Sequence, residues 1–244
     1  MKIFTDAANI EESLVRITDQ GDIRHMIKVM RMKEGDVLDV SDSAQWEYRA
    51  EILSIDEDLV LLSILDKQKF AREPGLSVTL FQGVPKQGKM ETIIQKCVEL
   101  GVASVVPVFM DRTVVVEKGN FSKKLERWQK VADEAVKQCR RGIIPSVCPQ
   151  IKFEEMGTQL AGFDLVLFPY ENEENYSIKD CLRGLSEKPK SVAIVIGPEG
   201  GFSDKEAERM KAWNAACVTL GKTILRTETA GMAALAMTMY ELEL

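Results

Sequence analysis

A glycine-rich segment in the C-terminal part of the chain has the composition of a ligand-binding loop. Residues 196–202 read IGPEGGF, and Ser203 with Glu206 has the spacing of a capping box that begins a helix. Glycine lets backbone atoms approach a ligand closely, and parallel sheets bind ligands at the carboxyl ends of their strands. The segment therefore predicts a binding loop between a strand and a helix. A glycine-rich turn that binds nothing explains the spacing equally well.

The familiar nucleotide-binding loops do not occur in the sequence. There is no G-x-G-x-x-G motif, which disfavours a dinucleotide-binding fold. Residues 221–223 read GKT, like the end of a phosphate-binding P-loop, but the glycine required five residues earlier is Ala216. An NTPase or kinase is therefore a poor interpretation.

Metal centres and hydrolytic triads are disfavoured as well. The five cysteines form no C-x-x-C pair and His25 is the single histidine, so we expect no zinc cluster and no multi-histidine metal site. No G-x-S-x-G motif accompanies His25. Scattered cysteines and the lack of an apolar N-terminal run predict a cytoplasmic protein.

The net charge of −6 conceals local basic clusters. Residues 118–141 hold eight Lys or Arg against three acids, mostly within a predicted helix. Such a stripe suits contacts with phosphates, although a solvated helix face is the commoner explanation of one stripe alone. Two smaller clusters, near residues 24–33 and 86–89, favour binding of a polyanion. The basic residues that we expect to contact it are Arg24, Lys28, Arg31, Lys86, Lys89, Lys123, Arg127, Lys130 and Arg141.

The elements that position these residues change in character along the chain. Residues 1–72 contain short alternating or apolar stretches at 37–40, 46–53 and 59–65, which predict a small β-barrel. The polar residues 67–75 end in Pro-Gly and predict a linker.

Beyond the linker, apolar strands alternate with helices, the pattern of a mainly parallel sheet covered on both faces. The expected strands are 76–81, 102–109, 163–168, 191–196 and 216–220. Among the expected helices are 90–100 and a long one capped by Ser122 that runs to Arg141 and stops at Gly142.

Two motifs taken together resemble the SPOUT methyltransferases. They are GPEGGF at 197–202 and LGKTILRTETA at 220–230, and more narrowly they resemble the ribosomal RNA small subunit methyltransferase E family. Residues 25–31, 89–91, 95–96, 99–101, 134–135, 138–139, 141 and 145 also match that family in order, so the resemblance spans nearly the whole chain. The chain departs from the family pattern at Lys2, where arginine is usual, and at Gly142, where asparagine is frequent.

The resemblance implies a fold and an activity. Residues 1–72 are expected to form a PUA-like RNA-binding β-barrel, with Lys2 among its RNA contacts. Residues 73–244 are expected to form an α/β SPOUT methyltransferase domain with a C-terminal trefoil knot. The implied reaction is S-adenosylmethionine-dependent methylation of N3 of a specific uridine in 16S ribosomal RNA, by a homodimer.

Three loops are implied to hold the cofactor, through backbone groups at strand ends and apolar walls. Their residues are Phe168, Pro169, Tyr170, Ile196, Gly197, Pro198, Gly200, Gly201, Leu220, Gly221, Ile224 and Leu225. Uracil N3 lies on the Watson–Crick edge, so the base must be unpaired or flipped out. Our hypothesis is that Arg226 stabilises the negative charge that develops on the base, while Glu199 or Glu228 accepts the proton or orients Arg226. A purely structural role for both glutamates is an equal alternative.

Two other functions remain open at this point. One is a SPOUT enzyme that methylates a ribose 2′-hydroxyl, because its cofactor loops would look alike. The other is a non-catalytic RNA-binding factor in ribosome assembly, which need not retain a cofactor pocket.

Overall fold

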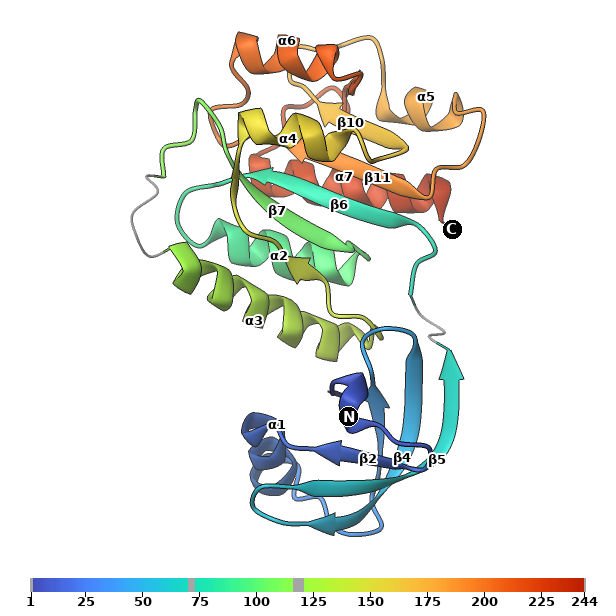
Figure 1. Ribbon diagram of the computed structural model, residues 1–244. Helices are drawn as coiled ribbons and strands as arrows, with labels where there is room; N and C mark the ends of the chain where they lie inside the picture. The colour runs from blue at the N-terminus through green and yellow to red at the C-terminus, as the bar shows by residue number, and fades with distance from the viewer. Residues whose placement is uncertain (1, 70–72, 116–120, 244) are drawn as a thin grey trace. The chain divides into compact units, whose positions relative to one another are not determined.

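The computed structural model describes residues 2–69, 73–115 and 121–243, and the chain divides into two compact units (Figure 1). The first comprises Met1–Glu73 with Val136–Ile144, and the second comprises Pro74–Ala135 with Pro145–Leu244. The long helix α3 (Phe121–Cys139) supplies residues to both units.

The first unit is built on a five-stranded sheet in the order β1-β3-β4-β5-β2. Its strands are β1 (Lys2–Phe4), β2 (Leu14–Ile17), β3 (Val37–Ser41), β4 (Trp46–Ile55) and β5 (Val60–Lys69). β1 is parallel to β3 and the other pairs are antiparallel. The three strands expected from the sequence are confirmed as β3, β4 and β5. The linker prediction was wrong for residues 67–69, which continue β5, and its residues 70–72 lie outside the described ranges.

The core of this unit lies on one face of each strand. Alternate residues of β4, such as Tyr48, Ala50 and Ile52, are buried, and they pack with Val40 and Leu62. Irregular register at Arg49/Ala50 and Ile52/Ser54 marks β-bulges, which bend strands and increase their twist. The strands can therefore curl around one apolar core, as a small barrel requires.

Three short helical segments complete the unit. They are η1 (Ala7–Asn9), α1 (Gln20–Arg24) and η2 (His25–Val29), which is a π-helix that follows α1 directly. The Asp19 carboxylate accepts a hydrogen bond of 2.8 Å from the backbone N–H of Asp22 and so caps α1.

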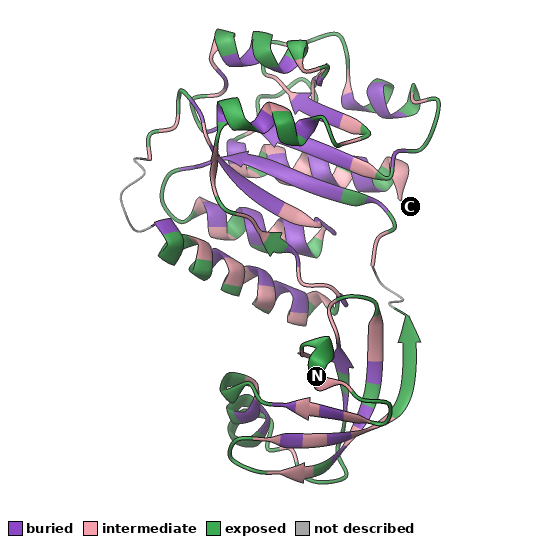
Figure 2. Cartoon of the chain, viewed as in Figure 1, coloured by how far each residue is buried: buried purple, intermediate pink, exposed green. Residues whose placement is uncertain are grey.

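The second unit has a parallel sheet in the order β12-β10-β11-β6-β7-β8, with β9 beside β7. Its strands are β6 (Ser77–Gly83), β7 (Ser104–Phe109), β8 (Ser146–Val147), β9 (Ile151–Lys152), β10 (Leu165–Pro169), β11 (Ser191–Ile196) and β12 (Ala216–Val218). All of their pairings are parallel, as the alternation in the sequence predicts. The central strands β6 and β11 are buried almost along their whole length (Figure 2).

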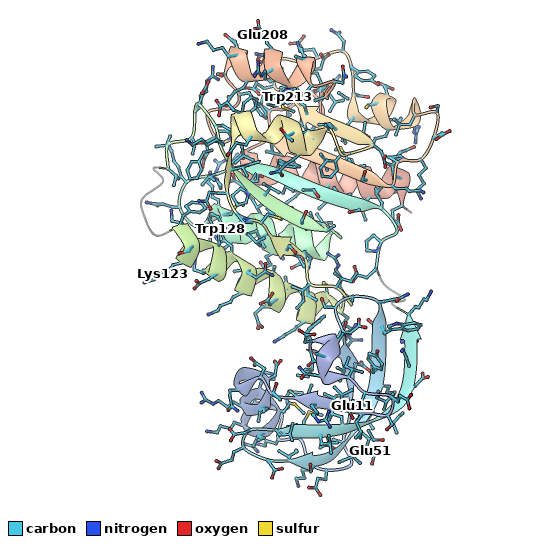
Figure 3. All side chains as sticks on the ribbon, in the orientation of Figure 1. Glu11, Glu51, Lys123, Trp128, Glu208 and Trp213 are labelled. Carbon is cyan, nitrogen blue, oxygen red and sulfur yellow. The ribbon has the colours of Figure 1, made fainter. Side chains whose placement is uncertain are left out.

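Helices cover both faces of this sheet (Figure 1). Besides α3 they are α2 (Lys89–Glu99), α4 (Phe153–Leu160), α5 (Ile178–Arg183), α6 (Asp204–Ala212) and α7 (Thr227–Leu242). α4 and α6 pack against Phe81, Phe168 and Val195, where Trp213 stacks on Phe153 at 5.2 Å between ring centroids (Figure 3). α7 packs on β6, β11 and α2.

Helix α3 departs from the expectation at both ends. It begins at Phe121, so Ser122 lies inside the helix and does not cap it. It ends at Cys139, because Arg140 adopts a left-handed backbone conformation with φ of 60°. Arg140, two residues before Gly142, thus ends the helix. Trp128 is buried while Lys123 is exposed, so the basic stripe does face solvent (Figure 3).

Candidate active site

A chain of buried hydrogen bonds joins the carboxyl ends of β6 and β11 to the start of α7. Gln82 Nε2 donates to Thr227 Oγ1 at 2.8 Å, and Thr227 Oγ1 donates to the carbonyl of Gly197 at 2.6 Å. Gln82 and Thr227 are buried polar residues. Because an unsatisfied buried polar group is costly, these bonds fix the first residue of α7 against both strand ends.

The glycine-rich loop after β11 packs closely against its neighbours. A Cβ atom on Gly83, at the end of β6, would lie 2.5 Å from the backbone nitrogen of Pro198. Gly201 has φ of 68° and its N–H donates to the carbonyl of Pro198 at 2.9 Å, which closes a turn. Arg112 Nη1 donates to the carbonyl of Gly200 at 2.9 Å. The loop is therefore rigidly placed.

The helix expected after this loop is confirmed as α6, with its capping box. Ser203 Oγ accepts from the N–H of Glu206, and Glu206 Oε2 accepts from the N–H of Ser203 at 2.8 Å. Glu206 Oε1 also accepts from the N–H of Asp111 at 2.8 Å. The buried carboxylate therefore links α6 to the segment after β7.

Lys89, at the start of α2, binds both glutamates that the sequence marks as catalytic candidates. Its Nζ lies 3.0 Å from Glu199 Oε1 and 3.2 Å from Glu228 Oε2. Glu199 Oε1 also accepts the N–H of Lys86 at 3.0 Å. Glu228 Oε2 is buried and its contact with Lys89 lies outside hydrogen-bond geometry. We expected Lys89 to contact RNA, whereas its position makes it a bridge between three elements of the second unit.

The charges of this cluster stabilise one another. Burial alone would raise the pKa of Glu199, but hydrogen bonds from Lys89 and from the N–H groups of Glu199 and Lys86 outweigh it, and the pKa is lowered. The Glu199 carboxylate has the largest effect on the pKa of Lys89 and raises it; burial opposes this rise, and the nearby Glu228 carboxylate adds a smaller one. A carboxylate that is held ionised in this way is a weaker base, which favours a positioning role for Glu199.

Arg226 occupies the position just before α7. Its side chain is exposed and its carbonyl accepts from the N–H of Ala230 at 2.8 Å. The next residue, Thr227, is fixed by the buried bonds to Gln82 and Gly197. The backbone of Arg226 is thus well placed, while its guanidinium extends from the N-terminal end of α7, where the helix dipole favours negative charge.

The loop between β12 and α7 has open space beside its backbone. Gly221 has φ of 139°, and a Cβ atom built on it meets nothing within 4 Å. Thr219 Oγ1 donates to the carbonyl of Gly221 at 3.0 Å. Ile224 is 83% exposed and Leu225 is half-buried. Exposed backbone beside apolar side chains is the composition of a site for a small organic ligand.

The expected loop at 168–170 is partly strand. Phe168 and Pro169 belong to β10, and Phe168 is fully buried. Its ring stacks on Tyr170 at 5.3 Å between centroids and meets Phe202 edge-on at 4.6 Å. Phe168 is therefore a core residue, so its ring supports the strand end and does not line an open pocket.

The expected RNA-contacting residues fall into two groups. Seven are exposed: Arg24, Lys28, Arg31, Lys86, Lys123, Arg127 and Lys130. Arg127 forms an ion pair with Glu91. The exposed residues can meet phosphates directly, because long basic side chains reorient in solvent.

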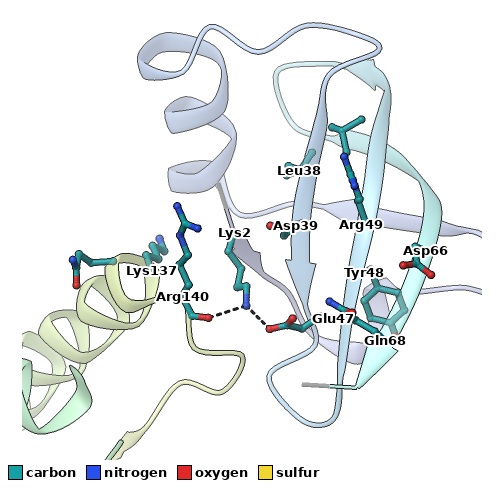
Figure 4. A pocket seen from close by; sticks show the side chains of 12 residues that line it. Lys2, Leu38, Asp39, Glu47, Tyr48, Arg49, Asp66, Gln68, Lys137 and Arg140 are labelled. Atoms are coloured by element: carbon teal, nitrogen blue, oxygen red, sulfur yellow. Dashed lines mark hydrogen bonds and ion pairs between the residues drawn. The ribbon is translucent and has the colours of Figure 1, made fainter. Parts of the chain in front are cut away.

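Two of the expected RNA-contacting residues, Lys2 and Arg141, have structural partners in the first unit. Lys2 Nζ pairs with Glu47 and donates to the carbonyls of Arg140 and Arg141, both at 3.2 Å (Figure 4). Arg141 is 7% exposed, and its Nη2 donates to Glu73 Oε2 at 2.9 Å. Lys2 lies in a hollow of about 900 Å³ that Arg49 and Arg140 also line.

No group of three or more His, Cys, Asp or Glu side chains among residues 2–69, 73–115 and 121–243 is arranged to hold a metal ion. In the same ranges, no helix combines the length and the apolar character that crossing a membrane requires.

Sequence reasoning missed several residues of this site. Gln82 directly follows the apolar stretch predicted to be a strand, so its place at a strand end was a usable signal. Thr227 lies inside the resemblance motif but suggested no partner. Arg112 and Glu171, which approach Gly200 and Gly201, carried no local signal at all.

Comparisons with known proteins identify the domains and the family of the chain. Residues 72–239 match the model of an RNA methyltransferase domain and residues 17–65 match that of an RNA methyltransferase PUA domain. The ribosomal RNA small subunit methyltransferase E of Bacillus subtilis is 34% identical over 96% of this chain and 93% of its own length. That of Synechocystis is 31% identical over 93% of this chain and 73% of its own.

Solved structures share the fold. The Neisseria gonorrhoeae ribosomal RNA small subunit methyltransferase E bound to S-adenosylmethionine superposes with a TM-score of 0.84 at 26% identity, over 98% of this chain and 96% of that one. A Legionella pneumophila structure in complex with the same cofactor gives 0.84 at 28% identity, over the same shares of the two chains. By its sequence and its fold, this chain belongs to the ribosomal RNA small subunit methyltransferase E family.

Proposed function

We propose that the chain transfers the methyl group of S-adenosylmethionine to N3 of a specific uridine in 16S ribosomal RNA. The observation that carries the proposal is the buried chain of hydrogen bonds Gln82–Thr227–Gly197, which joins the ends of β6 and β11 to the start of α7, next to Arg226. Family membership supports the reaction class, and the cofactor-bound Neisseria gonorrhoeae relative supports the donor.

The residues present fit the cofactor. Gly221 leaves open space beside backbone that can bind an adenine edge, and Ile224 with Leu225 supplies apolar surface. We assign the cofactor to backbone groups of residues 196–201 and 220–225, beside the end of β10 at Pro169 and Tyr170. When bound, the sulfonium supplies an already activated methyl group, so the protein has to position the donor and acceptor and exclude water.

Arg226 is assigned to the acceptor base. As N3 loses its proton, negative charge spreads onto the uracil oxygens, and a cation at the N-terminus of α7 stabilises it. Glu199 is held ionised by Lys89, so we assign it to positioning the loop and Lys89. Glu228 remains the candidate to orient Arg226 or to accept the proton.

The two units divide the work in this proposal. Residues 1–72 form the RNA-binding barrel, and residues 73–244 form the methyltransferase domain, with the C-terminal segment threaded as the trefoil knot of SPOUT enzymes. RNA phosphates are met by the exposed residues Arg24, Lys28, Arg31, Lys86, Lys123, Arg127 and Lys130. We place the enzyme in the cytoplasm, where its substrate is made.

A homodimer is part of the proposal. Residues 229–240 of α7 carry no charge. Two large side chains of this stretch are nevertheless exposed, Met237 at 38% and Tyr240 at 70%. A helix that is apolar all round is normally buried, and Ala233, Met237 and Tyr240 follow one face at helical spacing. A second copy of the chain covers this face.

The experiment that tests the function is methyl transfer from labelled S-adenosylmethionine to small ribosomal subunits. Arg226→Ala should lower the rate by about 100- to 1000-fold, as loss of an oxyanion-type donor does, while the cofactor affinity stays unchanged. Lys222→Ala, which removes an exposed cation from the same loop, is the matched control. A wild-type chain that binds the cofactor but transfers nothing would mean that the protein is an RNA-binding factor.

A further inference from the structure

The π-helix η2 presents apolar side chains to solvent. Val29 is 65%, Met30 49% and Ile27 37% exposed, and most of the segment α1–η2 has the colour of exposed residues (Figure 2). Other side chains already attach this segment to the first unit, because Ile23 and Met26 are buried in its core. Apolar residues thus lie on the solvent side of this segment at Ile27, Val29 and Met30 as well as in the core, and burial within the unit does not explain them.

The backbone of this segment is unusual. The N–H of Met30 bonds to the carbonyl of His25 at 3.0 Å, an i to i−5 bond, and that of Met32 bonds to Met26 at 3.0 Å. Arg31 then adopts φ of 54°. π-Helical turns and left-handed non-glycine residues have an energetic cost, and they concentrate at functional sites. Here both features occur in the segment that holds the exposed Val29 and Met30 and the buried Met26.

The charges around the three exposed apolar residues Ile27, Val29 and Met30, here called the apolar tip, favour binding of a polyanion. Arg24, Lys28, Arg31 and Lys33 are all exposed, and residues 23–33 contain no acid. Arg24 precedes the tip, Lys28 lies between Ile27 and Val29, and Arg31 follows Met30 directly. Four cations around the tip would add little to the affinity for an apolar protein partner. In RNA, by contrast, phosphates flank each pair of neighbouring bases and can bind these cations.

We propose that Ile27, Val29 and Met30 form a wedge that contacts unstacked bases of RNA, while the flanking cations bind the phosphates. Apolar side chains that enter between bases are an established means of distorting a nucleic acid helix, and proteins read RNA mostly at unstacked bases. The inference rests on the proposed RNA substrate. It adds a base-contacting element to the first unit, apart from the basic residues assigned to phosphates.

The test compares Val29→Ala/Met30→Ala with Leu53→Ala/Leu65→Ala in the full chain. Leu53 and Leu65 are 46% and 52% exposed in the same unit, so the control removes comparable apolar surface elsewhere. Affinity for naked 16S ribosomal RNA is measured over a range of salt concentrations. The wedge variant should bind about tenfold more weakly with an unchanged salt slope, and the control should bind like the wild type.

A second readout reports on the bases themselves. In RNA fragments that carry 2-aminopurine, wild-type protein should raise the fluorescence at the contacted step, and the wedge variant should not. Equal affinity of the two variants overturns the wedge, as does a loss that comes with a reduced salt slope. The wedge is also overturned if the wild-type chain binds no naked RNA. It is overturned as well if the wedge variant binds more weakly only to assembled subunits, because the tip would then contact a ribosomal protein. The wild type's methyl transfer to subunits, measured separately, reports on the proposed function.

Discussion

Lys89 Nζ lies 3.0 Å from Glu199 Oε1, which joins the first residue of α2 to the glycine-rich loop after β11. The two side chains are 31% and 25% exposed, so the pair is only partly shielded from water. The same ammonium group lies 3.2 Å from Glu228 on α7. One cation therefore connects three elements whose relative placement the proposed cofactor site needs.

Replacing this cation should change how stability depends on pH. The pKa of Glu199 is lowered from its ordinary value of 4.5, so its stabilising contribution is present above that value and is lost as the pH falls through the folded-state pKa. Lys89→Met should cost no more than about 1 kcal/mol at neutral pH, because the pair is partly exposed. Urea unfolding at about pH 7 and about pH 3.5 should show that the difference in free energy of unfolding between the wild type and Lys89→Met becomes smaller in acid.

The matched control is Lys96→Met, which removes a lysine of the same helix that pairs with Glu99 at 2.8 Å on the surface. The pKa of Lys89 is raised from 10.5, so that part of the stabilisation persists below 10.5 and is lost only in strong alkali. If the wild type exceeds Lys89→Met in free energy of unfolding by the same amount at both pH values, the Lys89–Glu199 contact does not form in solution.

Gly83 should tolerate no side chain, because its Cβ would lie 2.5 Å from the backbone of Pro198. Gly83→Ala should separate the end of β6 from the glycine-rich loop and lower cofactor affinity by about tenfold or more, as a displaced binding loop does. Gly88→Ala is the control, since Gly88 has φ of 67° but open space around it. It should cost about 1 kcal/mol of stability from backbone strain alone and leave calorimetric cofactor binding unchanged. Equal affinities in the two variants would contradict the close packing.

Glu73 should matter more to stability than an ordinary surface acid. Its carboxylate accepts from Arg141 Nη2 at 2.9 Å and from the N–H groups of Gly142 and Ile143 at 2.6 and 3.0 Å. Glu73→Ala removes a buried acceptor from the Arg141 guanidinium and from two backbone N–H groups, which should cost at least about 1–3 kcal/mol in thermal or urea unfolding. Glu11→Ala, which breaks the exposed pair with Arg16, should leave the free energy of unfolding close to that of the wild type. A small effect at Glu73 would refute the structural role given to Arg141.

The basic stripe of α3 should bind RNA through charge. Changing Lys123, Arg127 and Lys130 to Glu should weaken RNA binding and reduce the salt slope by about 0.7–0.9 for each lost phosphate contact, while cofactor affinity is kept. The control changes Lys205, Arg209 and Lys211 of α6, which are also exposed. If both triple variants lose affinity equally, net charge and not this surface governs binding.

Local patterns predicted the elements well but not the contacts between distant segments. The alternation along Trp46–Ile55 and the apolar runs of β6 and β11 were sufficient to predict those strands. The strands Lys2–Phe4 and Leu14–Ile17 were missed, because three or four residues are too few to show a period.

The site was predicted as motifs and not as a geometry. The motifs located Glu199, Arg226 and Glu228, but nothing local pairs Lys89 with glutamates more than a hundred residues away. Likewise, Lys2 and Arg141 carry the charge of RNA-contacting residues, and only the fold shows their partners Glu47 and Glu73. Charge predicts affinity for a polyanion only where the side chain is free to reach solvent.

The most direct test of the account is mass spectrometry of nucleosides from small subunits treated with the purified chain and S-adenosylmethionine. We predict a single new nucleoside, N3-methyluridine, that is absent when Arg226→Ala replaces the wild type. A methyl group found on a ribose 2′-hydroxyl, or none on the RNA at all, would contradict the assignment of Arg226 to a uracil base.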